Sequence, residues 1–298
     1  MSMTVRAFYF ETKGGMSSLD KKEYIVSKIL NNNVILASDF ITEEELILVG
    51  NGIGFGLKKG ERVKIRNADI VKSFIAYNED TKKQYLQLIN EMDAATMGVS
   101  EEIITLAEKE LGDLNNHIHI ALTDHIAFSI ERLKSGFDIE NPFLHEIQIL
   151  YSEEFEIALK GKQIIKDRLK VNISDSEVGF IALHIYSARQ DKKIIETMQD
   201  TRLLKNIIQL IQDDLNITID NKDLIYSRLI NHLKIAIRRA EENKYIENPL
   251  LNNIKLQLPQ SYELSKKIGK YIEQQKYLIV REDELGYLAL HIERIKRQ

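Results

Sequence analysis

The chain has 298 residues, of which 44% are hydrophobic, and its 41 basic and 45 acidic side chains leave a formal net charge of −4. This balance excludes nucleic-acid binding through bulk positive charge, so any such contact must be local. Because there is no cysteine, the sequence also excludes disulfides, thiolate metal sites and a catalytic cysteine. The length predicts about two domains, since a domain typically takes ~150 residues.

The N-terminal end predicts no signal peptide. Residues 1–23 lack the long apolar segment of a signal peptide, and we expect them to form an unstructured leader of unknown role. The chain has no run of about 18 apolar residues, so it predicts no membrane span. Together with the missing cysteines, these features favour a cytoplasmic protein without membrane insertion.

Residues 24–77 contain five short segments rich in valine, isoleucine, leucine and aromatic side chains. Polar or glycine-containing turns separate these segments at regular intervals, which predicts a small antiparallel sheet or barrel. A domain this small buries little surface, so we expect it to form a dimer. The predicted strands are YIVSKIL (24–30), NVILAS (33–38), ELILVG (45–50), RVKIR (62–66) and IVKSFIAY (70–77).

The glycine-rich segment VGNGIGFGLKKG, residues 49–60, invites comparison with a dinucleotide-binding loop. Gly50 and Gly52 fit the first two glycines of that motif, but Phe55 stands where the third glycine belongs. The residues that follow favour a turn and a strand, whereas the motif requires a helix N-terminus for the pyrophosphate. The sequence therefore argues against a nucleotide site and favours a glycine-rich bend between two strands.

From about residue 80 the hydrophobic pattern changes to a helical period. Apolar residues recur at i, i+3, i+4 and i+7, so residues 80–298 are expected to be predominantly helical. Ser100, which two glutamates follow, is predicted to cap the N-terminus of the first clear helix. The clearest helical segments are 100–111, 155–169, 201–215 and 224–242.

The helical region contains an internal repeat. A shift of 107 residues carries His125 onto His232 and His184 onto His291. The same shift superposes an Asn-Pro dipeptide and aligns the segment EVGFIALHI with ELGYLALHI. The sequence therefore predicts two copies of one all-α bundle, each of roughly a hundred residues.

Three roles are open for the four repeated histidines. They can be core residues that hydrogen-bond to the neighbouring backbone. A metal site is less favoured, because two histidines per copy fall short of the usual ligand set and Asp124 is replaced by Asn231 in the second copy. The third role is acceptance of a phosphoryl group, which a neutral imidazole nitrogen attacks in line. The added charge would then switch a packed helical interface.

The remaining motifs do not favour a catalytic role. His117 and His119 have no counterpart in the second copy, so we expect them to be structural or surface residues. The sequence has neither a G-x-S-x-G elbow nor an H-E-x-x-H helix, and it predicts no cofactor. A helical histidine–metal enzyme is an alternative that stoichiometric metal in the purified protein would favour.

Several segments in combination resemble the bacterial transcriptional antiterminators of the BglG/SacY type, and most closely their glucose-operon branch. The resemblance extends over residues 24–298. The segments that carry it are KILNNNVILAS (28–38), VGNGIGF (49–55), HIHIALTDHIAFSIERLKSGFDIENPFLHEIQILY (117–151) and the repeated EVGFIALHI and ELGYLALHI.

The resemblance implies a multidomain chain. A small all-β co-antiterminator RNA-binding domain at 24–80 would precede two all-α phosphotransferase regulation domains at 81–193 and 194–298. A dimer would bind a hairpin in nascent mRNA and prevent formation of an overlapping terminator. A DNA-binding activator with the same regulation domains is an alternative, but the strand-rich residues 24–77 do not resemble a helix-turn-helix.

By this resemblance the glycine-rich segment contacts RNA rather than a nucleotide. A cation, amide groups, bare backbone and an aromatic ring suit RNA, which proteins bind through backbone contacts and base stacking. Asn51 departs from the family, in which Arg or Lys is typical at this position, so a phosphate or base contact is missing. The RNA-binding residues that the resemblance implies are Lys28, Asn31, Asn33, Gly50, Gly52 and Phe55.

The resemblance also assigns the repeated histidines to a phosphorylation switch. It implies that a sugar-specific transporter component, an enzyme II, phosphorylates His125 and His184 and thereby inactivates the protein. His232 and His291 of the second copy would take phosphate from the general carrier HPr. Incoming sugar, glucose by resemblance, would drain phosphate from the transporter and release the block.

Overall fold

A computed structural model describes residues 21–70, 72–74, 92–220 and 223–297 of the chain. These residues belong to two compact units, Met1–Leu106 and Ala107–Gln298. Within the described residues, the first unit holds a β-sheet and the start of one helix, and the second unit is helical. Most of the predicted leader, residues 1–20, lies outside the described residues.

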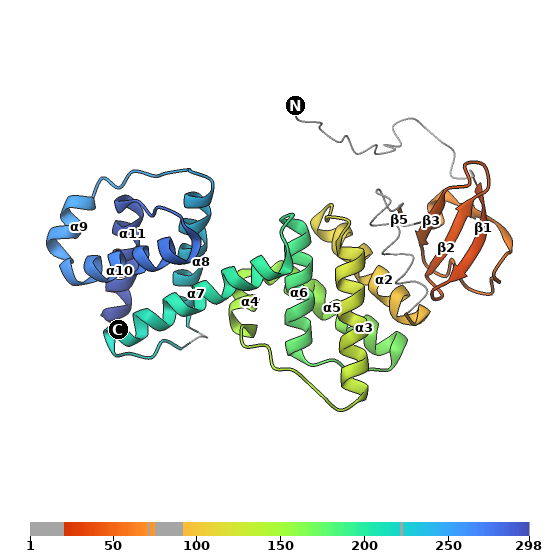
Figure 1. Cartoon of the computed structure of the whole chain (residues 1–298), viewed down its shortest axis with the longest axis horizontal. Helices are drawn as coiled ribbons and strands as arrows, with labels where there is room; N and C mark the ends of the chain where they lie inside the picture. Colours follow the sequence, from red (N-terminus) through yellow and green to blue (C-terminus); the bar gives the residue numbers. More distant parts are fainter. Residues whose placement is uncertain (1–20, 71, 75–91, 221–222, 298) are drawn as a thin grey trace. The chain divides into compact units, whose positions relative to one another are not determined.

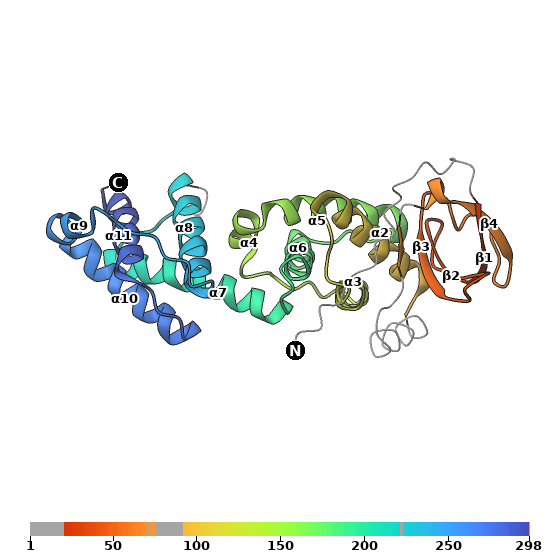
Figure 2. The same cartoon turned by 90° about the horizontal axis from the view of Figure 1, so that it is seen from above.

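The first unit is built on a five-stranded antiparallel sheet with the strand order β4-β1-β2-β3-β5. Figure 2 shows the sheet curving from β3 through β2 to β1 and β4. The predicted all-β domain is confirmed, although its first strand begins earlier than expected, at Lys21, and residues 75–77 of the last lie outside the described residues. The strands are β1 (Lys21–Ile29), β2 (Val34–Asp39), β3 (Glu45–Val49), β4 (Arg62–Arg66) and β5 (Lys72–Phe74) (Figures 1 and 2).

Alternating side chains of the strands form the core of the sheet, because successive residues of a strand point to opposite faces. Tyr24 and Val26 of β1 are buried, whereas Ile25 between them is 39% exposed. Pairing of Val34 with Val49 brings the β1–β2 turn beside the loop that follows β3. The buried cluster contains Tyr24, Val26, Ile35, Ala37, Leu48 and Ile65.

The helical part confirms the predicted duplication. Helix α2 (Ala94–Leu111) opens the first copy and α7 (Ile194–Leu215) opens the second. The 107-residue shift carries the other helices of the first copy onto those of the second, with only one boundary differing by a residue. The first copy continues with α3 (Ile118–Lys134), α4 (Leu144–Leu150), α5 (Ser152–Leu169) and α6 (Asp175–Arg189). The second continues with α8 (Leu224–Glu241), α9 (Leu251–Gln257), α10 (Pro259–Lys276) and α11 (Glu282–Lys296).

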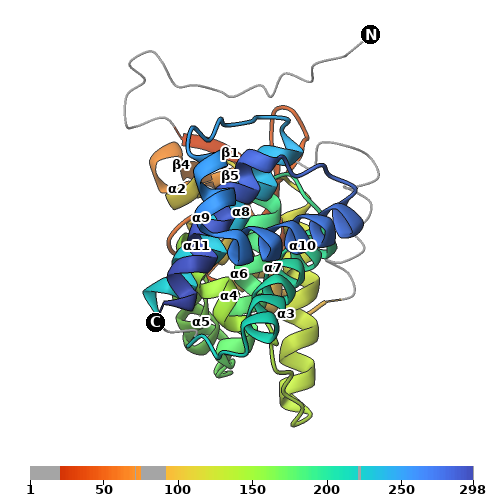
Figure 3. The ribbon, with the colours of Figure 1, turned by 90° about the vertical axis from the view of Figure 1, so that its left-hand side faces the viewer.

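Helix α7 connects the two copies within the second unit. It packs against α6 of the first copy and against α10 of the second, and Figure 1 shows it running between them. Helix α4 packs on α8, so the copies are also in contact away from α7. Figure 3 views the second copy from its own end, with α9, α10 and α11 toward the reader. No helix in the described ranges is both long and apolar enough to cross a membrane.

A repeated asparagine anchors the helix that carries the second histidine of each copy. Asn141 and Asn248 are buried, and each side-chain oxygen accepts a backbone N–H two residues further on, at 3.0 and 3.1 Å. Their amide nitrogens lie so close to Gly179 of α6 and Gly286 of α11 that a Cβ there would come within 2.9 and 2.7 Å. The glycines of EVGFIALHI and ELGYLALHI therefore permit close packing.

The predicted start of the first helix is wrong. Helix α2 begins at Ala94, and Ser100 lies inside it, where the hydroxyl donates to the carbonyl of Thr96 at 3.0 Å. The cap is Asp93, whose carboxylate accepts the backbone N–H of Thr96 at 3.0 Å and its hydroxyl at 2.9 Å. The short apolar run between Asp93 and Ser100 hid this earlier start, because it has no helical period of its own.

Candidate RNA-contacting loop and paired histidines

The glycine-rich segment forms the loop between β3 and β4, and the turn between β1 and β2 supports it. The backbone N–H of Gly50 donates to the carbonyl of Asn33, and that of Gly54 donates to the carbonyl of Asn32, both at 2.9 Å. The N–H of Gly52 donates to the side-chain Oδ1 of Asn33, also at 2.9 Å. The β1–β2 turn and the β3–β4 loop, which are distant in sequence, therefore form one hydrogen-bonded surface.

This loop needs glycine for two reasons, close approach to other backbone and positive φ angles. A Cβ on Gly50 would clash with the carbonyl oxygen of Asp69, and one on Gly54 would clash with that of Asn31. Gly52 has a φ of +69°, which other residues adopt only with strain. Because strand β4 follows the loop where a nucleotide site needs a helix, the loop presents bare backbone without a pyrophosphate site.

An aromatic ring and two cations project from the same loop. Phe55 is 76% exposed, so its face is available to stack on an unpaired base. Lys58 and Lys59 are exposed, as is Asn51. The loop thus combines stacking, local positive charge and accessible backbone, the chemistry that single-stranded or looped RNA requires.

The structure brings five of the six predicted RNA-contacting residues into this hydrogen-bonded surface. Oδ1 of Asn31 accepts the N–H of Asn33 at 2.7 Å, and the N–H of Phe55 donates to the carbonyl of Gly52 at 3.0 Å. Lys28 is half-buried near the end of β1, three residues before Asn31. Asn31 and Asn33 therefore shape the loop, a role that the sequence alone does not reveal.

The first histidine pair lies between α3 and α6. The rings of His125 and His184 face each other with centroids 4.9 Å apart. Nε2 of His125 lies 3.2 Å from Oε2 of Glu177, and the hydroxyl of Ser129 donates to the same oxygen at 2.7 Å. Arg132 forms an ion pair with the other carboxylate oxygen. A buried charge cluster therefore holds α3 and α6 together at the histidine pair.

Burial and charge set the protonation of Glu177 and of His184. Burial alone would raise the pKa of Glu177, but the hydrogen bond from His125 and the charge of Arg132 outweigh it and lower the pKa. Burial lowers the pKa of His184 to about 3, and the neighbouring His125 and His117 add to the effect. His184 is therefore neutral at pH 7, with a ring nitrogen able to act as a nucleophile.

The second pair repeats the geometry with different electrostatics. The rings of His232 on α8 and His291 on α11 have centroids 3.7 Å apart, and Arg239 pairs with Glu284 at 2.9 Å. Ala236 stands where the first copy has its serine, so Glu284 receives no hydroxyl hydrogen bond from that position. Burial raises the pKa of Glu284 in spite of Arg239, opposite to the shift of its counterpart.

Both histidines of the second pair favour the neutral form. Burial lowers the pKa of His291 to about 4, with His232 and Arg294 contributing. His232 is exposed, and its pKa is also lowered, first by partial burial and then by the charges of Arg239 and Arg294. Neutral imidazoles at an accessible position suit phosphoryl acceptance.

A metal role for the histidines gains no support from their surroundings. Across the described ranges, no three histidine, aspartate or glutamate side chains converge as metal ligands. His117 is exposed just before α3, and His119 is 4% exposed within α3, which matches the expected surface and structural roles.

Each copy contains a glutamate–arginine ion pair that the sequence alone does not predict. Arg132 pairs with Glu177, and Arg239 with Glu284, and the 107-residue shift superposes the two pairs. All four residues are visible in the repeat. Their contact depends on how α3 packs on α6 and α8 on α11, which the repeat does not specify.

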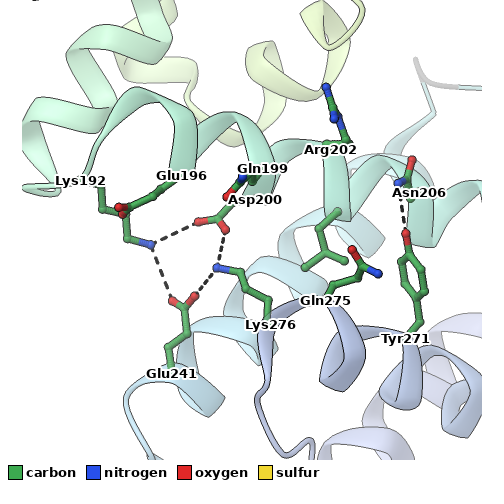
Figure 4. Close-up of a pocket in the computed structure, with 11 residues that line it drawn as sticks. Lys192, Glu196, Gln199, Asp200, Arg202, Asn206, Glu241, Tyr271, Gln275 and Lys276 are labelled. Carbon is green, nitrogen blue, oxygen red and sulfur yellow. Dashed lines mark hydrogen bonds and ion pairs between the residues drawn. The ribbon is translucent and has the colours of Figure 1, made fainter.

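A pocket of about 590 Å³ lies where α7 meets α8 and α10 (Figure 4). Lys276 pairs with Asp200, and with Glu241 at 2.7 Å. Lys192 lies 3.3 Å from Asp200 and 3.8 Å from Glu241, which closes a ring of two cations and two anions. The ring joins the segment before α7 to helices of the second copy, and its two positive and two negative charges balance.

Two protein families match separate parts of the chain. Residues 24–83 match the CAT RNA binding domain, and residues 101–188 and 205–295 each match the PRD domain. The first match covers the sheet and its glycine loop. The other two cover the repeated helices and all four paired histidines.

Relatives of known role match nearly the whole chain. Transcription antiterminator LicT of Bacillus subtilis (strain 168) is 35% identical over 279 residues, covering 92% of this chain and 99% of that protein. The GlcA/glcB genes antiterminator of Staphylococcus carnosus (strain TM300) is 33% identical over 279 residues, covering 92% and 96%. The crystal structure of GlcT CAT-PRDI is 41% identical and covers 56% of this chain and 98% of that one, with a TM-score of 0.46.

Proposed function

The chain belongs to the family of transcription antiterminators that join a CAT RNA binding domain to PRD domains, and we propose that its glycine loop is the RNA-contacting surface. It is an RNA-binding antiterminator regulated by the sugar phosphotransferase system. Its relatives are regulators, which agrees with the prediction that it is not an enzyme. The match to an RNA-binding domain disfavours the DNA-binding alternative.

The observation that carries the RNA site is the exposed ring of Phe55 beside bare backbone at Gly50 and Gly52. An unpaired base stacks on the ring, and the sugar–phosphate edge approaches the glycines closely. Lys28, Asn31 and Asn33 complete the surface from the adjoining strand and turn.

The three domains of this account occupy residues 24–80, 81–193 and 194–298. A dimer of the first domain binds a hairpin in nascent mRNA and prevents an overlapping terminator from forming. The small size of the sheet domain supports the dimer, because a core of so few residues gains stability from a partner.

Phosphorylation of His125 or His184 by a sugar-specific enzyme II is the inhibitory signal. An N–P bond to the acceptor nitrogen forms as the bond to the donor breaks, and the acceptor ring releases its proton. The new group brings about two negative charges beside the buried carboxylate of Glu177. Arg132 then has two competing anions, so the packing of α3 on α6 changes.

The second pair receives phosphate from the general carrier HPr. His232 is exposed on α8, which makes it accessible to a protein donor. His291 is half-buried, with its ring centroid 3.7 Å from that of His232, whose charge helps to lower the pKa of His291. Within the described ranges, Glu284 makes fewer side-chain contacts than Glu177, because only Arg239 is paired with it. The second histidine pair therefore responds differently to added charge.

Phosphorylation of the purified chain with HPr and with enzyme II tests the regulatory part of this proposal. Peptide mapping under conditions that preserve phosphohistidine should place phosphate on His125 or His184 with enzyme II, and on His232 or His291 with HPr. Phosphate confined to His117 or His119 would contradict the assignment of the paired histidines.

A further inference from the structure

The start of helix α2 contacts the RNA-contacting turn within the first unit. Nδ2 of Asn31 donates a hydrogen bond of 2.8 Å to Oε1 of Glu102. Gly98, one turn earlier on α2, touches the same side chain, since a Cβ there would lie 3.0 Å from Cβ of Asn31 and closer still to Nδ2. The glycine lets α2 approach the turn closely.

This contact crosses from one matched domain to another. Asn31 lies in the segment that matches the CAT RNA binding domain, and Glu102 lies at the start of the first segment that matches the PRD domain. The carboxylate of Glu102, in the regulatory part, therefore accepts a side-chain hydrogen bond from Asn31, which the proposed function assigns to RNA contact.

The negative charge of Glu102 disfavours RNA at Asn31. RNA carries a negative charge on every phosphate, so a carboxylate hydrogen-bonded to Asn31 repels the ligand that Asn31 is meant to contact. Asn31 and Glu102 are both half-buried, where water screens charges less than at the open surface. Simultaneous contact of Asn31 with the Glu102 carboxylate and with RNA is therefore unfavourable.

We propose that Glu102 is an intramolecular competitor of RNA, and that RNA binding requires the α2 segment 98–102 to leave Asn31. This inference rests on the proposed RNA role of Asn31 and adds a direct route from the first regulation domain to the RNA-binding domain. Molecules in which Glu102 contacts Asn31 do not bind RNA. The apparent RNA affinity is therefore the intrinsic affinity multiplied by the fraction of molecules in which this contact is broken. Any signal that moves α2 changes that fraction.

The test uses the full chain and a hairpin RNA enriched from a randomised stem-loop pool on the wild-type protein. Glu102→Ala should lower the dissociation constant about tenfold or more, because it removes a hydrogen bond to a charged group. Glu102→Gln keeps an acceptor oxygen for Asn31 but removes the charge, so it should give a smaller gain of about twofold. The control is Glu156→Ala, which removes an exposed carboxylate of α5 and should leave the affinity unchanged.

Hydrogen exchange gives a second measurement that does not depend on a variant. In the wild-type chain, saturating hairpin RNA should speed exchange of the α2 amides around residues 98–106, because this segment loses its contact with Asn31. In Glu102→Ala the same amides should exchange faster even without RNA.

The results of these experiments distinguish a failure of the Glu102 proposal from a failure of the RNA-binding proposal. If Glu102→Ala binds the hairpin with wild-type affinity and RNA leaves α2 exchange unchanged, the competitor is overturned and the RNA-binding role stands. If no hairpin is enriched on either the wild-type chain or Glu102→Ala, the RNA-binding proposal itself is overturned, and the competitor with it.

Discussion

Nε2 of His125 lies 3.2 Å from Oε2 of Glu177, whose side chain is 1% exposed. A phosphoryl group on His125 would therefore add about two negative charges next to a carboxylate that water does not reach. Like charges this close in a poorly screened site are strongly unfavourable. The phosphorylated chain must re-pair Arg132 or separate α3 from α6, and this requirement makes the site a switch.

Glu177→Gln should reveal how much the cluster stabilises the first copy. The substitution keeps the shape but leaves the half-buried Arg132 without its anion, so we expect a loss of about 3 kcal/mol in the free energy of unfolding at neutral pH. Because the folded pKa of Glu177 is lowered, its stabilisation is present above the ordinary value of 4.5 and is lost as pH falls through the folded value. Urea unfolding of both proteins across this range should show their stabilities converging in acid. A pH-independent difference would contradict the ion-pair account.

His184 should resist protonation. Its folded pKa is about 3 against an ordinary value of 6.5, so the unfolded chain binds the proton first. The stability that neutral His184 contributes is complete above 6.5 and is lost as pH falls from there toward 3. NMR titration of the imidazole nitrogens should find His184 neutral at about pH 5, a value between the unfolded and folded pKa. A midpoint near 6.5 would place the ring in solvent.

Phe55→Ala should weaken hairpin binding by about 1–3 kcal/mol without changing stability, because the ring stacks on a base rather than packing in the core. Phe137→Ala is the matched control, since Phe137 is 68% exposed in the helical region. Gel-shift titration and thermal unfolding of both variants check this prediction. Equal affinities for the two variants would remove Phe55 from the RNA site.

Asn51→Arg should tighten hairpin binding and steepen its dependence on salt. The exposed loop position gains a cation that neutralises a phosphate and releases its counterion. Asn252→Arg adds the same charge at an exposed position of α9 and should leave the salt slope unchanged. A slope for Asn51→Arg equal to that of the control would mean that position 51 faces away from the RNA.

Periodic patterns made most of the elements predictable from the sequence. The strands alternate buried and exposed residues, as at Tyr24, Ile25 and Val26, and the duplicated helices share one spacing. The start of α2 was missed because its cap, Asp93, precedes a run without a helical pattern, whereas Ser100 stands before two glutamates. Local cap preferences cannot decide between two such candidates.

The functional contacts were less predictable because they depend on packing between distant segments. The repeat and the family resemblance identified His125, His184 and the glycine loop. They gave no sign that Glu177 holds His125, or that Glu102 binds Asn31 from 71 residues away in the sequence. Such contacts are set by how a helix approaches its neighbour, which one-dimensional spacing does not contain.

The most direct measurement is single-round transcription in vitro through a terminator that overlaps the enriched hairpin, with the purified chain added before and after phosphorylation by enzyme II. The account predicts read-through with the unphosphorylated chain and loss of read-through after phosphorylation. His125→Ala should keep its read-through under the same treatment, and His184→Ala should keep part of it. Full read-through by the phosphorylated wild-type chain would contradict the claim that these histidines control RNA binding.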